Sequence, residues 1–484
     1  MFLVSRGLPR IPGGLKRDVL PSITPLLLMS STRTFHIACI MASPAKRKAE
    51  NQASPAKAKK SKVQIPEYHL TPSRRDEDGE IVWPAPKTQI ERAREIIKEC
   101  ASAQKPTLIL PDKDADGLSS GAILYHTLTS VGLPSDLISV YFPPKGSDVH
   151  DESTRSTVTE ISPTYIFVLD QGSRRTGPLY DKLHTCLVID HHFAEEGGYP
   201  QGAEFVTAHD CPPVATSALL TYIICLPLHP GLEDKVSWLA ALGTHGDLGN
   251  TLKWQPPFPD MTATFKKNPK KSINDAVSLV NAPRRSAAYN VEAAWEAVIS
   301  ADGPQPLLSN DTLREAQFEV KQETERWSHV PPKFSRDATI AVLTIKSAAQ
   351  VHPVVATRWA GFLKSDKMEI VMCANEGYLP DKVNFSCRVA KHARAREGKD
   401  KVNIIQTLES IVADDPDLRS RLGESFARGH KEASGGIINV QEWEEFKKLM
   451  GVGENTRKKA EAKTPEKRKR AQKNTLQNYF VKAA

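Results

Sequence analysis

The chain has 484 residues, of which 40% are hydrophobic, so it is long enough for about two or three domains with apolar cores. No apolar run reaches the roughly 18 residues that a membrane helix needs, and we expect no membrane partner. The seven cysteines are scattered without a CxxC pair, which argues against a disulfide framework or a structural zinc site. This cysteine usage indicates reduced thiols inside a cell.

The net charge of +8 is distributed unevenly along the chain. Residues 1–62 carry +10 and residues 451–484 carry +7, which leaves −9 for residues 63–450. The positive balance therefore belongs to the two ends. A nucleic-acid surface on the folded part must be a local patch, because that part as a whole is acidic.

Residues 1–84 are predicted to be a disordered, basic segment that carries targeting signals. Residues 1–40 have Asp18 as their single acid and resemble a mitochondrial presequence, with an ordinary disordered leader as the alternative. Met41 opens a stretch with basic clusters at 46–48 and 57–62, which is typical of a bipartite nuclear signal, although a solvated basic tail looks the same. We predict nuclear localisation, with the mitochondrion as a second destination if translation starts at Met1.

Strand-length and helix-length patterns alternate over residues 85–260. Apolar runs of strand length lie at 107–110, 165–169 and 186–189, and helical patterns include residues 119–132 and 216–226. This alternation predicts a parallel sheet covered by helices. In such sheets ligands bind beyond the carboxyl ends of the strands.

A second, smaller α/β pattern follows a connecting helical segment at residues 261–335. It covers residues 336–450, with apolar runs at 338–345, 368–374 and 383–390 and a helix at about 402–413. Residues 451–484 form a Lys/Arg-rich tail that we expect to be disordered. The predicted fold is α/β: a parallel-sheet domain and a smaller α/β domain, with an active-site cleft between them.

Acidic and imidazole side chains follow four apolar segments of the first predicted domain. They are Asp112, Asp114 and Asp116 after the first strand, Asp170 after the second, Asp190, His191 and His192 after the third, and His245 and Asp247 in the stretch ALGTHGDLGN. The fold class predicts that these ends are neighbours. An Asp-rich loop such as DKDADG is, taken alone, as typical of a turn or a helix cap.

Together, the five aspartates other than Asp190 would bring a charge of about −5 into one site. Carboxylates this close cannot all ionise unaided. Two divalent cations would nearly cancel this charge. Mixed Asp and His ligands suit Mn²⁺, with Mg²⁺ next. A pair of such ions activates water for in-line displacement at phosphorus, so the sequence predicts metal-dependent hydrolysis of a phosphoester.

The motif order DxDxDG, LDQG, DHH and GTHGD resembles motifs one to four of the DHH phosphoesterase superfamily, which includes the exonuclease RecJ and its archaeal relatives. Ser386-Cys387-Arg388 and RGHKEASGG at 428–436 resemble two elements of the DHH-associated domain. The resemblance spans residues 105–440. It implies a two-domain phosphodiesterase with its metal site in the first domain.

The resemblance also implies individual roles. Metal ligands would be Asp112, Asp114, Asp116, Asp170, His191 and Asp247, with Asp112 at a position where relatives have His or Asp. His192 would face the phosphate, and Asp190 would orient His191 or touch a metal. His245 is either a histidine of the core or a residue that hydrogen-bonds to a metal ligand.

Substrate contacts are implied for the second domain. Ser386 and Arg388 would grip a phosphate, Gly435 and Gly436 would let the backbone approach the nucleic-acid chain, and His430 would contact the terminal or scissile nucleotide. The usual double glycine before the motif histidine reads Arg428-Gly429 in this chain. No extra oligonucleotide-binding domain is evident.

The tail contains KNTLQNYF at 473–480, in which Leu476, Tyr479 and Phe480 would share one face of a helical turn. This resembles the box by which replication proteins dock on the sliding clamp PCNA, with Lys473 in place of the usual glutamine. A disordered tail with chance aromatics is the alternative.

The combined prediction is a RecJ-like phosphodiesterase that uses two Mn²⁺ ions, or Mg²⁺, to hydrolyse single-stranded nucleic acid in DNA repair or replication. DNA is favoured over RNA. The alternatives are an oligoribonuclease or a small (cyclic di)nucleotide phosphodiesterase, and a catalytically silent replication scaffold.

Overall fold

The computed structural model describes residues 71–454, except 364, 397, 399 and 400. The predicted targeting signals and the clamp-binding residues Leu476, Tyr479 and Phe480 lie outside the described residues. Within the described part of the chain, no helix combines the length and the apolar character needed to cross a membrane.

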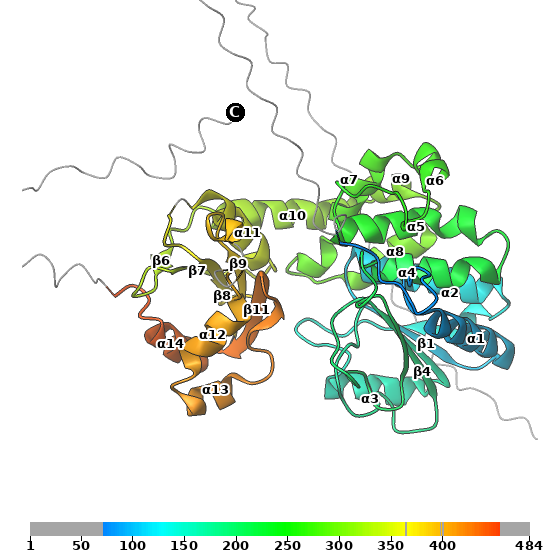
Figure 1. The fold of residues 1–484 in the computed structure, drawn as a ribbon, viewed down its shortest axis with the longest axis horizontal. Coiled ribbons are helices and arrows are strands. Elements are labelled where there is room, and N and C mark those ends of the chain that lie inside the picture. The colour runs from blue at the N-terminus through cyan, green and yellow to red at the C-terminus, as the bar shows by residue number, and fades with distance from the viewer. Residues whose placement is uncertain (1–70, 364, 397, 399–400, 455–484) are drawn as a thin grey trace, which may run out of the picture. The chain divides into compact units, whose positions relative to one another are not determined.

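The first sheet has five strands in the order β2-β1-β3-β4-β5, and every neighbouring pair is parallel. Two of its strands, β1 and β4, are labelled in Figure 1. The strands are β1 (Thr107–Pro111), β2 (Ile138–Val140), β3 (Tyr165–Leu169), β4 (Thr185–Asp190) and β5 (Glu204–Thr207). The predicted parallel sheet is confirmed. The three apolar runs found in the sequence are β1, β3 and β4, its three central strands.

Both faces of this sheet are covered, which explains why its central strands are apolar throughout rather than alternating. Ile109, Phe167 and Leu187 face one buried cluster, and Leu108 and Val188 face another. The helices of this region are α1 (Lys87–Ala103), α2 (Ala115–Ser130), α3 (Glu152–Ile161), α4 (Ser217–Cys225) and α5 (Leu232–Asp247). Helix α2 packs against both α4 and α5.

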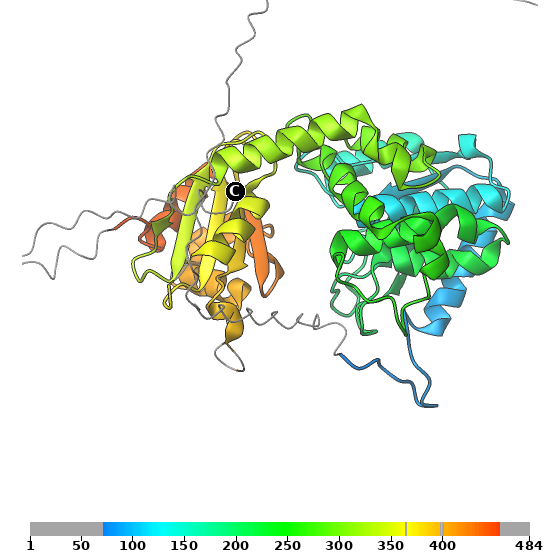
Figure 2. The same ribbon diagram turned by 90° about the horizontal axis from the view of Figure 1, so that it is seen from above.

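Residues 261–335 are mainly helical. The helices are α6 (Thr262–Lys267), α7 (Lys270–Val280), α8 (Val291–Ser300), α9 (Pro304–Leu308) and α10 (Asp311–Trp327). A short 3₁₀ turn, Pro283–Arg285, lies between α7 and α8. Helix α7 packs on α5, and in Figure 2 these green helices are seen beside the cyan helix α2.

The second sheet has six strands in the order β10-β11-β9-β8-β7-β6, and it is mixed, with β7 and β8 as its parallel pair. The strands are β6 (Lys333–Phe334), β7 (Ile340–Ile345), β8 (Ile370–Asn375), β9 (Lys382–Val389), β10 (Arg428–His430) and β11 (Ala433–Asn439). Its helices are α11 (His352–Phe362), α12 (Ile404–Val412), α13 (Pro416–Leu422) and α14 (Val440–Leu449). The sequence predicted β7, β8 and β9, but the short or glycine-containing strands β6, β10 and β11 were missed.

Candidate metal centre

The predicted site residues lie at the carboxyl ends of the central strands of the first sheet. Asp112 follows β1 and Asp170 follows β3, and their backbone N–H groups donate to Leu169 O and Ile189 O at 2.9 Å each. Asp190 ends β4, so His191 and His192 start the next loop. Strands β2 and β3 flank β1 on opposite sides, so the strand order changes direction at β1. Open parallel sheets bind ligands at the carboxyl ends of the strands where the order changes direction in this way.

Three overlapping groups of side chains at this edge could each hold a metal ion. They are Asp116 with His191 and Asp247, Asp170 with His191 and His192, and Asp112 with Asp114 and Asp170. Within each group the ligand atoms lie within 4.8 Å of one another. All six residues predicted as metal ligands therefore belong to one cluster, as the fold class requires.

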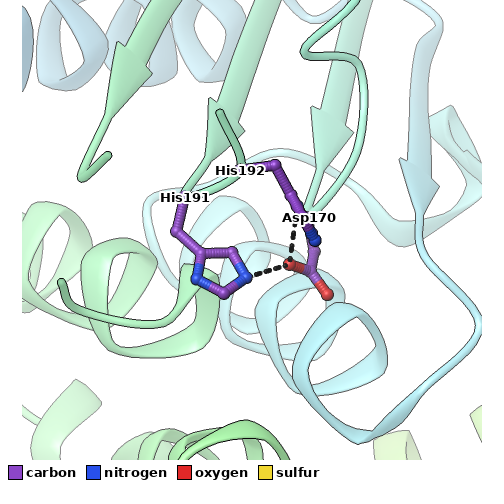
Figure 3. Close-up of side chains that lie close together, drawn as sticks. All are labelled: Asp170, His191 and His192. Carbon is purple, nitrogen blue, oxygen red and sulfur yellow. Dashed lines mark ion pairs between the residues drawn. The ribbon is translucent and has the colours of Figure 1, made fainter. Parts of the chain in front are cut away.

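His191 belongs to two of these groups, and its imidazole points toward the Asp170 carboxylate (Figure 3). Its Nε2 lies 3.3 Å from an oxygen of Asp170 and 3.3 Å from an oxygen of Asp247. That nitrogen is buried and makes no hydrogen bond with any of the described residues. Burial opposes protonation of this imidazole, but Asp247 and Asp116 raise its pKa to about 9. A buried imidazole nitrogen held between two carboxylates could ligate a divalent cation in place of its proton.

Asp116 is held by the start of helix α4. Its two carboxylate oxygens accept hydrogen bonds from the backbone N–H groups of Ser217 and Ala218, at 2.8 and 3.0 Å. The Ser217 hydroxyl donates to Asp170 at 2.9 Å, so one helix terminus positions two carboxylates. Burial and the nearby charge of Asp247 raise the pKa of Asp116 to about 7, and burial with Asp116 and Asp114 also raises the pKa of Asp170. This excess of negative charge calls for cations.

Asp114 has two roles in the structure, and one of them is the ordinary cap that an Asp-rich loop allows. Its Oδ1 accepts from the N–H groups of Asp116 and Gly117 at 3.0 and 3.2 Å, which caps helix α2. Its Oδ2 lies 3.2 Å from Nη2 of Arg284, in the turn after α7. Burial alone would raise the pKa of Asp114, but Arg284 and these backbone donors lower it.

Arg284 was not among the site residues predicted from the sequence. Nor was Ser217, whose hydroxyl and N–H hold the carboxylates. Neither has a spacing relation to the motifs, so no sequence signal was available beyond the adjacent pair Arg284-Arg285.

Asp190 orients its neighbours and has little capacity left for a metal. One oxygen accepts from the backbone of His191 and from Nδ1 of His192, at 2.7 and 2.8 Å. The other accepts from the Ser173 hydroxyl at 2.6 Å. Burial opposes ionisation of Asp190, but the hydrogen bonds from His192 and Ser173 lower its pKa to about 2. Of the two predicted roles, orientation fits this geometry, and its main object is His192.

Two glycines explain the tight spacing of the motifs. A Cβ atom on Gly117 would lie 2.5 Å from the backbone oxygen of Asp112. On Gly243 it would lie 2.4 Å from the Ala218 Cβ and 2.6 Å from an Asp116 oxygen. The absence of side chains therefore lets α5 and α4 close around Asp116.

His245 is a core residue in this structure. Its Nδ1 bonds Asn274 Oδ1 at 2.7 Å, and its Nε2 accepts from the indole N–H of Trp254 at 3.1 Å. Its ring stacks on Phe265, with the centroids 5.8 Å apart. Both nitrogens are used, so of the two predicted roles the core role fits the geometry.

The predicted substrate residues of the second sheet lie on strands β9, β10 and β11. Gly435 pairs with Ser386 in register, and Arg388 donates to the Ser386 hydroxyl at 2.8 Å. A Cβ on Gly435 would lie 2.3 Å from Phe385 O, and one on Gly436 would lie 2.8 Å from the Phe385 ring. These glycines therefore allow close packing of β11 on β9, a reason that the sequence analysis did not foresee.

His430 is the last residue of β10, where its backbone pairs with Ala433. Gly429, at φ +108°, keeps the conformation that glycine permits, while the substituted position Arg428 is exposed. The departure from the double glycine is thus accommodated at the surface.

A pocket of about 1100 Å³ adjoins the loops after β3 and β4. Ser173, Arg174 and Phe193 line it from the first sheet, and Gly435 and Gly436 line it from the second. The pocket is large enough for more than one nucleotide. Its lining includes residues of both predicted domains.

The parallel sheet with carboxylates and imidazoles at its carboxyl edge defines an α/β protein with a candidate divalent-metal site. Residues 106–244 match the model of the DHH family, N-terminal domain. Residues 106–244 therefore form a DHH-family N-terminal domain, and the fold of the chain resembles that of RecJ.

The structure is similar to that of RecJ from Thermus thermophilus in complex with Mn²⁺, with a TM-score of 0.54 and 16% identity. The similarity covers 76% of this chain and 55% of that RecJ, so the chain spans about half the length of that protein. It is also similar to the DHH domain of a member of a family of ribosomal proteins, with a TM-score of 0.53, 14% identity, and coverage of 76% and 91%. No curated protein matches the chain significantly.

Proposed function

We propose that this protein is a RecJ-like, Mn²⁺- or Mg²⁺-dependent phosphodiesterase that hydrolyses single-stranded nucleic acid, with DNA as the preferred substrate. The observation that supports this most directly is the position of Nε2 of His191, buried 3.3 Å from oxygens of both Asp170 and Asp247 within the three overlapping ligand groups. Bound divalent cations would supply Lewis acidity that activates water and neutralises charge at phosphorus. The donor set fits them, since it combines carboxylates with one or two imidazoles.

The residues around the metal ligands complete this function. Because Asp190 engages Nδ1 of His192, the half-exposed His192 ring can present Nε2 to a phosphate oxygen. Arg284 beside Asp114 adds a guanidinium that can bind phosphate, and Arg388 with Ser386 supplies a second one. Cationic groups are required because the carboxylates alone would repel the substrate.

The decisive experiment is digestion of single-stranded DNA and RNA 20-mers and of dinucleotides, each labelled at either end, with Mn²⁺, Mg²⁺ or EDTA. We expect metal-dependent shortening of the DNA 20-mer and its loss in Asp170→Asn and His191→Ala, with Asp181→Asn as a control at an exposed carboxylate. Cleavage of dinucleotides or RNA alone would reassign the protein to an oligoribonuclease or small-nucleotide phosphodiesterase. Bound metal without any cleavage would favour the replication scaffold.

A role in DNA repair or replication would be supported by docking on the sliding clamp PCNA through Leu476, Tyr479 and Phe480. We expect a peptide of residues 468–484 to bind PCNA, and the triple alanine variant of that peptide not to bind. Nuclear localisation is proposed from the basic clusters at 46–48 and 57–62, and an additional mitochondrial form starting at Met1 is proposed from the composition of residues 1–40. Fluorescent fusions beginning at Met1 or Met41 would test it.

A further inference from the structure

An exposed aromatic residue follows the two histidines of the candidate metal centre in the chain. Phe193 follows His192 in the chain, and 62% of its surface is exposed. A single exposed apolar residue is ordinary in folded proteins. Phe193, however, lines the pocket that adjoins the loops after β3 and β4.

The ring of Phe193 is held by a second ring. His209 meets it edge to face, with the centroids 5.0 Å apart and the planes at 71°. Such a contact favours one orientation of the phenyl ring while leaving much of the ring exposed.

The position of this ring pair is tied to the strand that carries the metal ligands. Strand β5 pairs with β4, so Thr207 lies opposite Asp190. The next backbone N–H, from Ala208, donates to Asp190 O at 3.1 Å, and His209 N donates to the Thr207 hydroxyl at 3.2 Å. The loop residues Phe193 and His209 therefore both start from the carboxyl ends of β4 and β5, where His191 and His192 also lie.

Charge alone does not explain what this part of the pocket would bind. Arg174 and Arg175 line it, but so do Asp148, Glu195 and Glu196. Arg174 is already paired with Asp148 at 3.5 Å and with Glu424. Attraction of phosphates is therefore partly cancelled near Phe193, whereas an aromatic face binds any base by stacking.

We propose that Phe193, oriented by His209, is a stacking platform for a nucleobase of the strand bound at the metal centre. This inference rests on the proposed function, because it names how the substrate of that same site is held. It makes Phe193 a substrate-binding residue that is indifferent to base identity but requires a base. The preferred substrate would then be a strand with an unpaired base next to the bound phosphate.

The experiment compares (dT)₁₂ with (dT)₁₂ strands that carry one abasic residue, scanned along the strand. An abasic residue keeps the phosphate and removes the base. Equilibrium binding is measured by fluorescence anisotropy with Ca²⁺ in place of Mn²⁺, which supplies the same charge to the carboxylates, and cleavage is measured separately with Mn²⁺. The full-length chain is compared with Phe193→Ala and Phe193→Trp. Phe318→Ala is the matched control, because Phe318 is 61% exposed on helix α10.

For the wild type we expect one or two abasic positions to weaken binding by roughly 5- to 100-fold. Phe193→Ala should bind intact (dT)₁₂ about as weakly as the wild type binds the abasic strand, and the abasic penalty should vanish. Phe193→Trp should restore the penalty, and Phe318→Ala should retain it.

An undiminished abasic penalty in Phe193→Ala, or no abasic penalty in the wild type, would overturn the stacking proposal. Failure of the proposed function is read separately. It would appear as absence of cleavage of intact (dT)₁₂ with Mn²⁺, whatever the binding data show.

Discussion

Arg284 lies 170 residues after Asp114 in the chain, yet its Nη2 is 3.2 Å from Oδ2 of Asp114. The carboxylate is thus shared between the cap of helix α2, the candidate metal centre and a guanidinium. Burial opposes the charge on Arg284, but Asp114 and Asp112 raise its pKa, so the side chain stays cationic. A fixed positive charge beside metal ligands repels metal ions and attracts phosphate.

Replacing Arg284 by glutamine should therefore change metal binding and substrate binding in opposite directions. We expect Arg284→Gln to bind Mn²⁺ a few-fold more tightly, because a nearby positive charge is removed. The KM for single-stranded DNA should rise about tenfold or more, because a phosphate contact is lost. Titration with Mn²⁺ and steady-state cleavage measure the two effects, and Arg314→Gln serves as a control at an exposed arginine. Weaker binding of both ligands would instead indicate damage to the loop around Asp114.

Metal affinity should increase steeply with pH. Without metal, the pKa of His191 is raised to about 9 and that of Asp116 to about 7, and both groups must lose their protons to ligate a cation. Protons therefore compete below these values, and the Mn²⁺ affinity should rise by up to about tenfold per pH unit for each proton released. Calorimetric titrations at pH 6.5, 7.5 and 8.5, in buffers of different ionisation enthalpy, give both affinity and proton release. A pH-independent affinity would argue against His191 as a ligand.

A methyl group at Gly243 should displace Asp116 and so disturb the candidate metal centre. The added Cβ would lie 2.4 Å from Ala218 Cβ and 2.6 Å from Asp116 Oδ1, so α5 must move away from α4. We expect Gly243→Ala to lower the free energy of unfolding by roughly 1–3 kcal/mol and to weaken Mn²⁺ binding.

Gly361 offers the matched control, because it is also in a helix but has no neighbour within 4 Å of a Cβ. Gly361→Ala should be neutral or stabilising by up to about 1 kcal/mol. Urea denaturation and Mn²⁺ titration measure both variants. Equal behaviour of the two would contradict the close packing around Asp116.

Buried His126 should make stability depend on pH. Burial and the charge of Lys235 lower its pKa in the folded state from 6.5 to about 4. Above pH 6.5 the imidazole is neutral in both states and contributes no pH dependence. As the pH falls from 6.5 towards 4, the unfolded chain binds a proton that the folded chain cannot, so stability decreases.

At pH 5 this linkage amounts to about 2 kcal/mol. His126→Gln should remove that much of the loss measured between pH 7.5 and pH 5 by urea denaturation in EDTA. His229→Gln, at an exposed histidine, should leave the loss unchanged. An identical pH dependence in wild type and His126→Gln would show that His126 does not cause the loss of stability at low pH.

Much of the fold could be predicted because burial on both faces marks the central strands. β3 begins and ends where its apolar run does, at Tyr165 and Leu169. Strands β2 and β5 were missed because they are short edge strands with fewer buried positions. Strands β10 and β11 were missed because glycine has no side chain to produce an apolar pattern, although Gly435 is needed where β11 packs on β9.

The sequence by itself determined the class of site, because each apolar strand is followed directly by carboxylates or imidazoles and parallel strands align their ends. Only the tertiary structure decided how those groups are used. It showed that the Asp190 oxygens accept hydrogen bonds from His191, His192 and Ser173, and that Arg284 pairs with Asp114. These contacts join segments far apart in the chain, and their distances depend on how helices and loops pack rather than on any local spacing.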